Sequence, residues 1–182
     1  MVRHDDEWHC VHTGAPRAAS PVMAGLVRLV PAMTLARLIA SGCGCGYAPV
    51  AAGTVASAIA VPIGAALLLA SPMLLAVAAL LAAVGGVWAI HAARVEGDPG
   101  WVVIDEFAGQ WLALCGLAHV SITGLLAGFI IFRLLDVTKP GPIGWADRQG
   151  GATGIMADDL IAGAIAAGIL WAINSHWPTL LG

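Results

Sequence analysis

Charged side chains are scarce in this sequence. Asp, Glu, Lys and Arg make up 10% of its 182 residues, whereas they make up about a quarter of an average soluble domain. Hydrophobic residues make up 59%, and the mean hydropathy is +0.88. This composition argues against a water-soluble globular domain and favours a helical bundle whose outer surface faces lipid.

Basic residues and cysteines are also few. The chain has 8 Lys and Arg against 11 Asp and Glu, with a net charge of −3, and no basic tract that could follow a phosphate backbone. Nucleic-acid binding is therefore excluded. The four cysteines match neither a disulfide framework nor a paired C-x-x-C zinc site; they are Cys10, Cys43, Cys45 and Cys115.

Three long stretches have no charged residue, at 38–93, 107–132 and 160–182. A membrane span needs roughly 20 mostly apolar residues, so these stretches should contain the spans. The resulting fold class is all-α, a polytopic membrane bundle of about five spans. The expected spans are Ala52–Ala70, Met73–His91, Trp101–His119, Ser121–Lys139 and Asp158–Trp177.

The segment 107–132 is compatible with one span or with the inner parts of two. As two, it turns at residues 119–121, and every Lys and Arg of the chain then lies on one side of the membrane. The positive-inside rule makes that side cytoplasmic. Five spans are therefore preferred, and four is the alternative.

The N-terminal residues have a different character from the rest of the chain. Residues 1–20 have no apolar core of a signal peptide and are expected to form a flexible cytoplasmic tail. Residues 22–41 contain Arg28, Pro31 and Arg37 among apolar residues and predict a broken helix on the membrane surface. The remainder, 21–182, is expected to be a single membrane-embedded domain.

Five acidic residues lie at or near the expected inner ends of spans, where they are costly and point to function. On a helix, Asp105 shares a face with Gly109 and Asp159 with Gly163, and such small residues let helices approach closely. Carboxylates that converge need a cation, and hard oxygen ligands favour Mg²⁺. The five acids are Asp105, Glu106, Asp136, Asp158 and Asp159.

Basic and hydroxyl groups near these acids indicate a phosphate site. Arg133, Lys139 and Arg148 can bind a phosphoryl group beside a metal. Glycine-rich segments precede the first and last expected spans, and their backbone N–H groups, with the Thr54 and Ser57 hydroxyls, can face an anion. The alternatives stay open that Asp158 and Thr54 are helix caps and that Asp136 is a structural partner of Arg133 or Lys139.

Four blocks of the chain, in order, resemble the phosphatidylglycerophosphatase A family. The family's V-I-D-E-x-x-G block appears intact, as does its F-R-x-x-D-x-x-K-P-x-P-I block, whereas Ala52 and Ala56 depart from the proline and glycine of the first block. One extra residue separates the glycines of the last block. The four blocks are Gly46–Ser57, Val103–Gly109, Phe132–Ile143 and Gly151–Gly163.

The resemblance implies a Mg²⁺-dependent phosphatase that converts phosphatidylglycerophosphate to phosphatidylglycerol, with its active site on the cytoplasmic side of the bacterial inner membrane. In the hypothesis adopted here, Asp105, Asp136 and Asp159 bind Mg²⁺. Glu106 or Asp158 orients the attacking water or accepts its proton. Arg133, Lys139 and Arg148 hold the phosphate, with the Thr54 and Ser57 hydroxyls. A covalent aspartyl-phosphate route stays open.

A small helical transporter or channel with an acidic ion site is the alternative function. A transport path needs polar groups near the middle of the membrane, and Gln110 is the deepest strongly polar residue expected there. The partners expected are the lipid substrate and membrane lipid. The sequence leaves the oligomeric state open, and a homo-oligomer is compatible with it.

Overall fold

The structure is a computed structural model that describes residues 2–4, 7–9, 33–177 and 179–181. It contains two compact units, 1–33 and 34–182. In the first unit, strand β1 (Val2–His4) pairs antiparallel with strand β2 (Glu7–His9). Most of the expected flexible tail and the first part of the expected surface helix, up to residue 32, lie outside the described residues.

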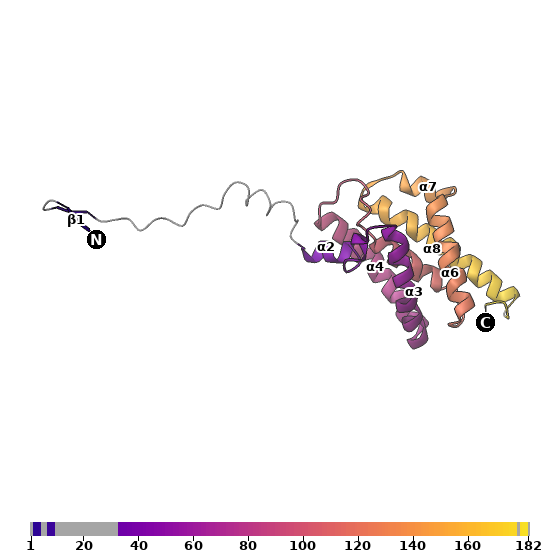
Figure 1. The fold of residues 1–182 in the computed structure, drawn as a ribbon. Helices are drawn as coiled ribbons and strands as arrows, with labels where there is room; N and C mark the ends of the chain where they lie inside the picture. The colour runs from indigo at the N-terminus through magenta and orange to yellow at the C-terminus, as the bar shows by residue number, and fades with distance from the viewer. Residues whose placement is uncertain (1, 5–6, 10–32, 178, 182) are drawn as a thin grey trace. The chain divides into compact units, whose positions relative to one another are not determined.

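Helices and loops make up the described part of the second unit, which contains no strand, and this confirms the all-α prediction for it (Figure 1). Five helices form the bundle; the short helix α2 and a 3₁₀ turn precede them, and the short helix α7 lies between the last two. The elements are α2 (Leu35–Ala40), η1 (Cys45–Tyr47), α3 (Ala52–Ala70), α4 (Pro72–Ala92), α5 (Ile104–Leu114), α6 (Ile122–Thr138), α7 (Pro142–Asp147) and α8 (Gly151–His176).

Helices α3 and α4 match the predicted spans almost to the residue. Ser71 ends α3 in an extended conformation, and its side chain then caps α4 by accepting a hydrogen bond from the Met73 amide at 3.2 Å. Pro72 occupies the first position of α4, where its missing N–H costs nothing. The Ser-Pro pair therefore makes the tight turn between two apolar helices.

Helix α5 is much shorter than the predicted span at 101–119. Its 11 residues rise about 16 Å, whereas the hydrocarbon core is about 30 Å thick. None of these residues is exposed, because α5 packs against α3, α4, α6 and α8. The helix is the centre of the bundle, and its neighbours shield it from lipid.

Helix α8 begins seven residues before the predicted span. Gly150 and Gly151 have positive φ angles of 67° and 64°, and the helix continues from there through Gly154. Burial of Ala152, Ile155 and Met156 outweighs the low helix propensity of glycine. Asp158 therefore lies two turns inside the helix, and the alternative that it is an N-cap is wrong.

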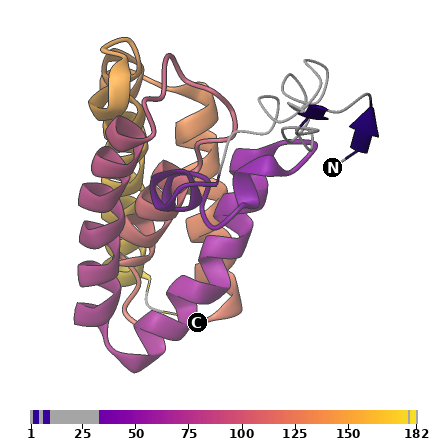
Figure 2. The ribbon, with the colours of Figure 1, turned by 90° about the vertical axis from the view of Figure 1, so that its left-hand side faces the viewer.

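The short α3–α4 and α5–α6 turns lie at one end of the bundle, away from the charged loops (Figure 2). The Ser121 hydroxyl, at the start of α6, donates to the carbonyl of Leu181 near the C-terminus. A leucine cluster from α3, α4, α5 and α8 packs at the same end. Its buried members are Leu68, Leu75, Leu114, Leu117, Leu170 and Leu181.

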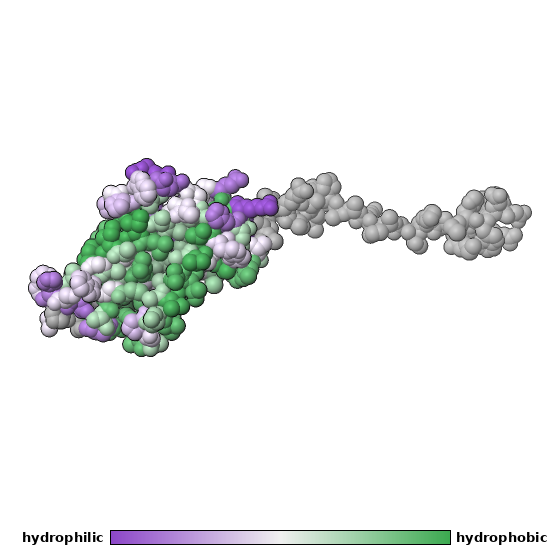
Figure 3. Space-filling view, turned by 180° about the vertical axis from the view of Figure 1, so that it is seen from behind, coloured by the Kyte–Doolittle hydropathy of each residue, from purple (hydrophilic) through white to green (hydrophobic). Residues whose placement is uncertain are grey.

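The face of the helical unit seen in Figure 3 is apolar between its polar ends. Large side chains such as Leu69, Leu80 and Val84 are exposed on α3 and α4. Three described helices, α3, α4 and α8, are long and apolar enough to cross a membrane. The chain is therefore a membrane protein, whereas the count of five spans is not confirmed, because α5 and α6 are shorter.

Helices α5 and α8 approach closely because glycines line their contact. A Cβ added at Gly163 would lie 2.3 Å from the carbonyl oxygen of Gly109, and one at Gly116 would lie 2.2 Å from the carbonyl oxygen of Ala167. Backbone atoms of a packed helix cannot move aside as a flexible side chain can. The distance between these two helices therefore depends on glycine.

We expect Gly163→Ala to lower the stability of the purified protein by about 1–3 kcal/mol, because the added methyl overpacks the α5–α8 contact. Gly168→Ala on the same helix is the matched control, since a Cβ there meets nothing within 4 Å. The control should change stability by less than about 1 kcal/mol, in the stabilising direction. Thermal unfolding in detergent measures both, and equal melting temperatures for the two variants would contradict the prediction.

Candidate active site

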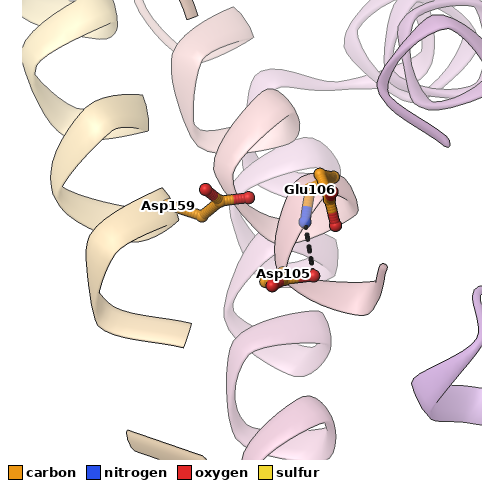
Figure 4. A group of neighbouring side chains, drawn as sticks. All are labelled: Asp105, Glu106 and Asp159. Carbon is orange, nitrogen blue, oxygen red and sulfur yellow. Dashed lines mark hydrogen bonds between the residues drawn. The ribbon is translucent and has the colours of Figure 1, made fainter. Parts of the chain in front are cut away.

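Helices α5 and α8 bring three carboxylates together at the charged end of the bundle. Asp105, Glu106 and Asp159 each place a carboxylate oxygen within 4.8 Å of the others, and the Asp159 side chain points from α8 toward α5 (Figure 4). Asp105 is 8% exposed and Asp159 is 3% exposed. The glycine contact between the two helices thus holds buried acids face to face.

A second group of carboxylates overlaps the first. Asp136 of α6 and Asp158 of α8 lie within the same 4.8 Å limit of Asp159. Asp159 therefore belongs to both groups and connects α5 to α6 across α8. Each neighbouring backbone amide orients one acid, since the Glu106 amide donates to Asp105 at 3.1 Å and the Asp159 amide donates to Asp158 at 3.0 Å.

Arg133 joins the acidic cluster to α3. Its guanidinium donates to Asp136 one turn along α6 and to the Thr54 hydroxyl at 3.2 Å. Gly53 lies beside this contact, and a Cβ there would come within 2.1 Å of a Glu106 carboxylate oxygen. The glycine at the start of α3 therefore leaves room for Glu106 and Arg133 to reach the same point.

Lys139 closes the opposite side of the cluster. It ends α6 in a left-handed conformation with φ of 46°, and its ammonium donates to Asp158 at 2.7 Å and to Asp147. Burial acts to lower the pKa of Lys139, but the hydrogen bonds and negative charges of Asp147 and Asp158 outweigh it and raise the pKa well above its ordinary value. Lys139 is therefore a permanent positive charge at the site.

These groups line a cavity of about 250 Å³. It contains all five predicted acids together with Arg133 and Lys139, so negative charge exceeds positive charge. The lining residues are Ala52, Gly53, Asp98, Gly100, Val102, Asp105, Glu106, Arg133, Asp136, Lys139, Ile155, Asp158 and Asp159.

Three other predicted residues lie outside this lining. Thr54 contacts it through Arg133. Ser57 is fully buried, and its hydroxyl donates to the Gly53 carbonyl of its own helix at 2.9 Å. Arg148 is exposed beyond the end of α7. The structure thus brings the acids, Arg133 and Lys139 together and leaves Ser57 and Arg148 apart.

Asp98 lines the cavity although the sequence analysis did not single it out. It lies in the loop between α4 and α5, next to Pro99 and seven residues before Asp105. The available signal was an acidic residue in a loop that returns to the acidic helix. Asp98 lies outside the expected span in the sequence, so the sequence did not indicate that it is close to the site.

The donor set fits a hard divalent cation. Glu106 Oε2 and Asp159 Oδ2 are buried and have no hydrogen-bond partner among the described residues. Buried anionic oxygens without partners are costly, and these two lie within carboxylate groups that converge from α5, α6 and α8. Carboxylate oxygens without nitrogen or sulfur ligands are typical of Mg²⁺ or Mn²⁺ sites rather than zinc sites.

Comparison with known proteins assigns a family to the part of the chain that contains this site. The family model for phosphatidylglycerophosphatase A matches residues 38–174, a range that includes every acidic residue of the cavity together with Arg133 and Lys139. No solved structure matches the chain.

Curated relatives extend the match. Phosphatidylglycerophosphatase A of Escherichia coli K12 is 41% identical over 145 residues, which cover 78% of this chain and 84% of the relative. A Bacteroides thetaiotaomicron protein provisionally named phosphatidylinositol-3-phosphatase is 34% identical over 137 residues, covering 69% and 85%. Phosphatidylglycerophosphatase A of Haemophilus influenzae is 37% identical over 81 residues, covering 44% and 49%. These matches confirm the resemblance seen in the four blocks, and the chain belongs to the phosphatidylglycerophosphatase A family.

Proposed function

We propose that this protein hydrolyses the terminal phosphomonoester of phosphatidylglycerophosphate, releasing phosphate and phosphatidylglycerol. The observation that carries the proposal is the cavity in which six carboxylates, including the five predicted ones, meet Arg133 and Lys139. Transport is disfavoured because the opposite end of the bundle is filled by the leucine cluster, which offers no polar path across the membrane.

Asp105, Asp136 and Asp159 would hold Mg²⁺, with Asp159 as the carboxylate common to both acidic groups. The bound ion would supply Lewis-acid stabilisation of the charge that develops on the phosphoryl oxygens. This set spans α5, α6 and α8, so the ligands depend on the packing of all three helices. The unpartnered Asp159 Oδ2 supports its role as a ligand.

Arg133 and Lys139 would bind the substrate phosphate. Arg133 is already fixed by Asp136 and Thr54, and Lys139 by Asp147 and Asp158, so both cations are oriented before the substrate arrives. Ala52 and Gly53 also line the cavity, at the start of a helix that no described side chain caps. The free backbone N–H groups there favour an anion.

Glu106 would orient the attacking water and accept its proton. Its Oε2 has no hydrogen-bond partner among the described residues, whereas Asp158 is engaged by Lys139. The water oxygen forms a bond to phosphorus, the bond from phosphorus to the glycerol oxygen breaks, and the leaving alkoxide takes a proton from solvent water, to which Glu106 returns the proton it accepted. Asp158 then acts by holding Lys139 in position.

We place the enzyme in the bacterial inner membrane, with the acidic cavity toward the cytoplasm. The long loops that carry Lys and Arg lie at the cavity end, and the positive-inside rule makes that end cytoplasmic. The successive helices α3, α4, α5, α6 and α8 alternate in direction, so the chain ends on the opposite side. We propose five passes of the chain, of which the one that contains the short helix α5 is shielded by the surrounding helices.

The orientation predicts the accessibility of introduced cysteines. In a variant whose native cysteines are replaced by serine, a cysteine at Gln149 should react with an impermeant maleimide only after the inner membrane is opened. A cysteine at His119 should react in intact spheroplasts, because the α5–α6 turn lies at the other end. Labelling of both positions only after opening would rule out this topology.

Removal of the metal should abolish phosphate release. The purified protein in detergent, treated with EDTA, should lose activity, and Mg²⁺ or Mn²⁺ should restore it, because both ions accept an octahedral set of oxygen ligands. Zn²⁺, which prefers nitrogen and sulfur ligands, should restore less. Full activity in the presence of chelator would end the metal proposal.

Loss of the shared ligand should be severe. We expect Asp159→Asn to lower kcat by about a hundredfold or more, because asparagine keeps the size of the side chain but removes its charge. The protein should still fold, since burying a neutral amide is less costly than burying an unpaired carboxylate.

Asp147→Asn is the matched control for this variant. Asp147 also contacts Lys139 but is 41% exposed and does not line the cavity. It should keep most of the activity, because an exposed ion pair contributes little. Similar activities for the two variants would argue against Asp159 as a ligand.

A further inference from the structure

An apolar groove lies along the contact between α3 and α6. It has a volume of about 220 Å³, and its walls contain no polar side chain. Ala58 and Val61 of α3 form one wall, and Leu125, Leu126 and Phe129 of α6 form the other. Leu126 is 56% exposed, so the groove opens on the outer surface of the bundle.

The groove lies on the same two helices as part of the candidate active site, further from the polar end. Thr54 and Arg133 bridge α3 and α6 at the polar end. Ala58 and Phe129 each lie four residues further from that end, or about 6 Å along the helix axis. Leu125 lies eight residues from Arg133, about 12 Å along α6. The hydrogen bond between Arg133 and Thr54 therefore marks the headgroup end of the groove.

We infer that this groove binds an acyl chain of the lipid substrate, which enters from the membrane between α3 and α6. The inference rests on the proposed function. A lipid whose phosphate lies against Arg133 keeps its headgroup at the polar end of these helices, and its chains extend toward the membrane interior beside them. The groove is apolar over that depth.

A chain in the groove gains orientation rather than hydrophobic free energy. Membrane lipid is already as apolar as the groove walls, so transfer between them is driven by packing. Packing against Phe129 and Leu125 restricts where the glycerol backbone lies, and positioning of the reacting phosphate depends on such restraint. The groove should therefore affect turnover of the lipid more than binding of the headgroup.

A larger apolar cavity, of about 550 Å³, lies between α2, α3, α4 and α5. Figure 2 shows α3 and α4 separating from their shared turn, with α2 across the wide end. A packed cluster of Ala56, Ala60, Val103 and Phe107 joins α3 to the start of α5, and along α3 its Ala56 lies between Gly53 of the acidic cavity and Ile59 of this one. The smaller groove is therefore the better continuation of the active site.

Blocking the groove tests the inference. Ala58→Phe fills it from α3, and kcat/KM is measured with dipalmitoyl phosphatidylglycerophosphate in detergent micelles. The deacylated headgroup is measured in parallel, as a substrate and as a competitor of the lipid. We expect kcat/KM for the lipid to fall about tenfold or more, with the KM or the inhibition constant of the headgroup unchanged.

Two substitutions of the same kind serve as controls. Ala82→Phe fills the larger cavity, and Ala76→Phe adds the same bulk at an exposed position of α4. Both variants should keep the wild-type kcat/KM for the lipid relative to the KM or inhibition constant of the headgroup. Leu126→Trp blocks the groove from α6 and should reproduce the effect of Ala58→Phe, which covers the case that Ala58→Phe fails to fold.

The outcomes separate the inference from the proposed function. If the wild type releases no phosphate from the lipid, the proposed function fails. If it does, but the groove variants impair the reaction of the lipid and the binding of the headgroup equally, or change neither, bulk lipid fills the groove and the inference is wrong. A selective loss of lipid turnover in Ala82→Phe would assign the acyl chain to the larger cavity and would also overturn the inference.

Discussion

The close contact between α5 and α8 is the constraint on which the site depends. Gly109, Gly116 and Gly163 let the two backbones approach to a distance that any side chain would prevent. That approach sets Asp105 and Asp159 face to face, both almost completely buried. Without it, the acids would be separated by a layer of side chains or would reach water singly.

Burying several carboxylates together is unfavourable unless opposite charge compensates them. Arg133 and Lys139 supply part of that charge, and each is tied to one acid of the second group, Asp136 and Asp158. The first group has no such partner among the described residues, and its unpartnered oxygens are where a cation would complete the site. The protein's own electrostatics therefore favour metal at the contact between α5 and α8.

The membrane explains why the site can be buried and still reach its substrate. Helix α5 is short and enclosed, so α3, α6 and α8 shield its polar first turn from lipid. Polar groups at membrane depth are tolerated only where protein or a water-filled cavity surrounds them. The cavity lies at the polar end of the bundle, and an apolar groove lies further along the helices, between α3 and α6. A lipid phosphatase needs both environments within one molecule.

Several features could be predicted from the sequence by itself. Runs without charge and the Ser71-Pro72 pair predict α3 and α4 almost to the residue, because span length and turn chemistry are local properties. The five acids, Arg133 and Lys139 were found because charges near apolar helices are costly and therefore informative. Helical periodicity also predicts the small-residue faces that carry Asp105 and Asp159.

The tertiary structure decided the rest. It shortened α5, because a helix enclosed by four others does not need to span the membrane, and it started α8 early, because burial stabilises a glycine-rich first turn. It included Asp98 in the cavity and left out Ser57 and Arg148. Sequence periodicity shows which face of a helix a residue occupies, whereas the distance between two faces depends on the side chains of both helices at their contact, and these are brought into register only by folding.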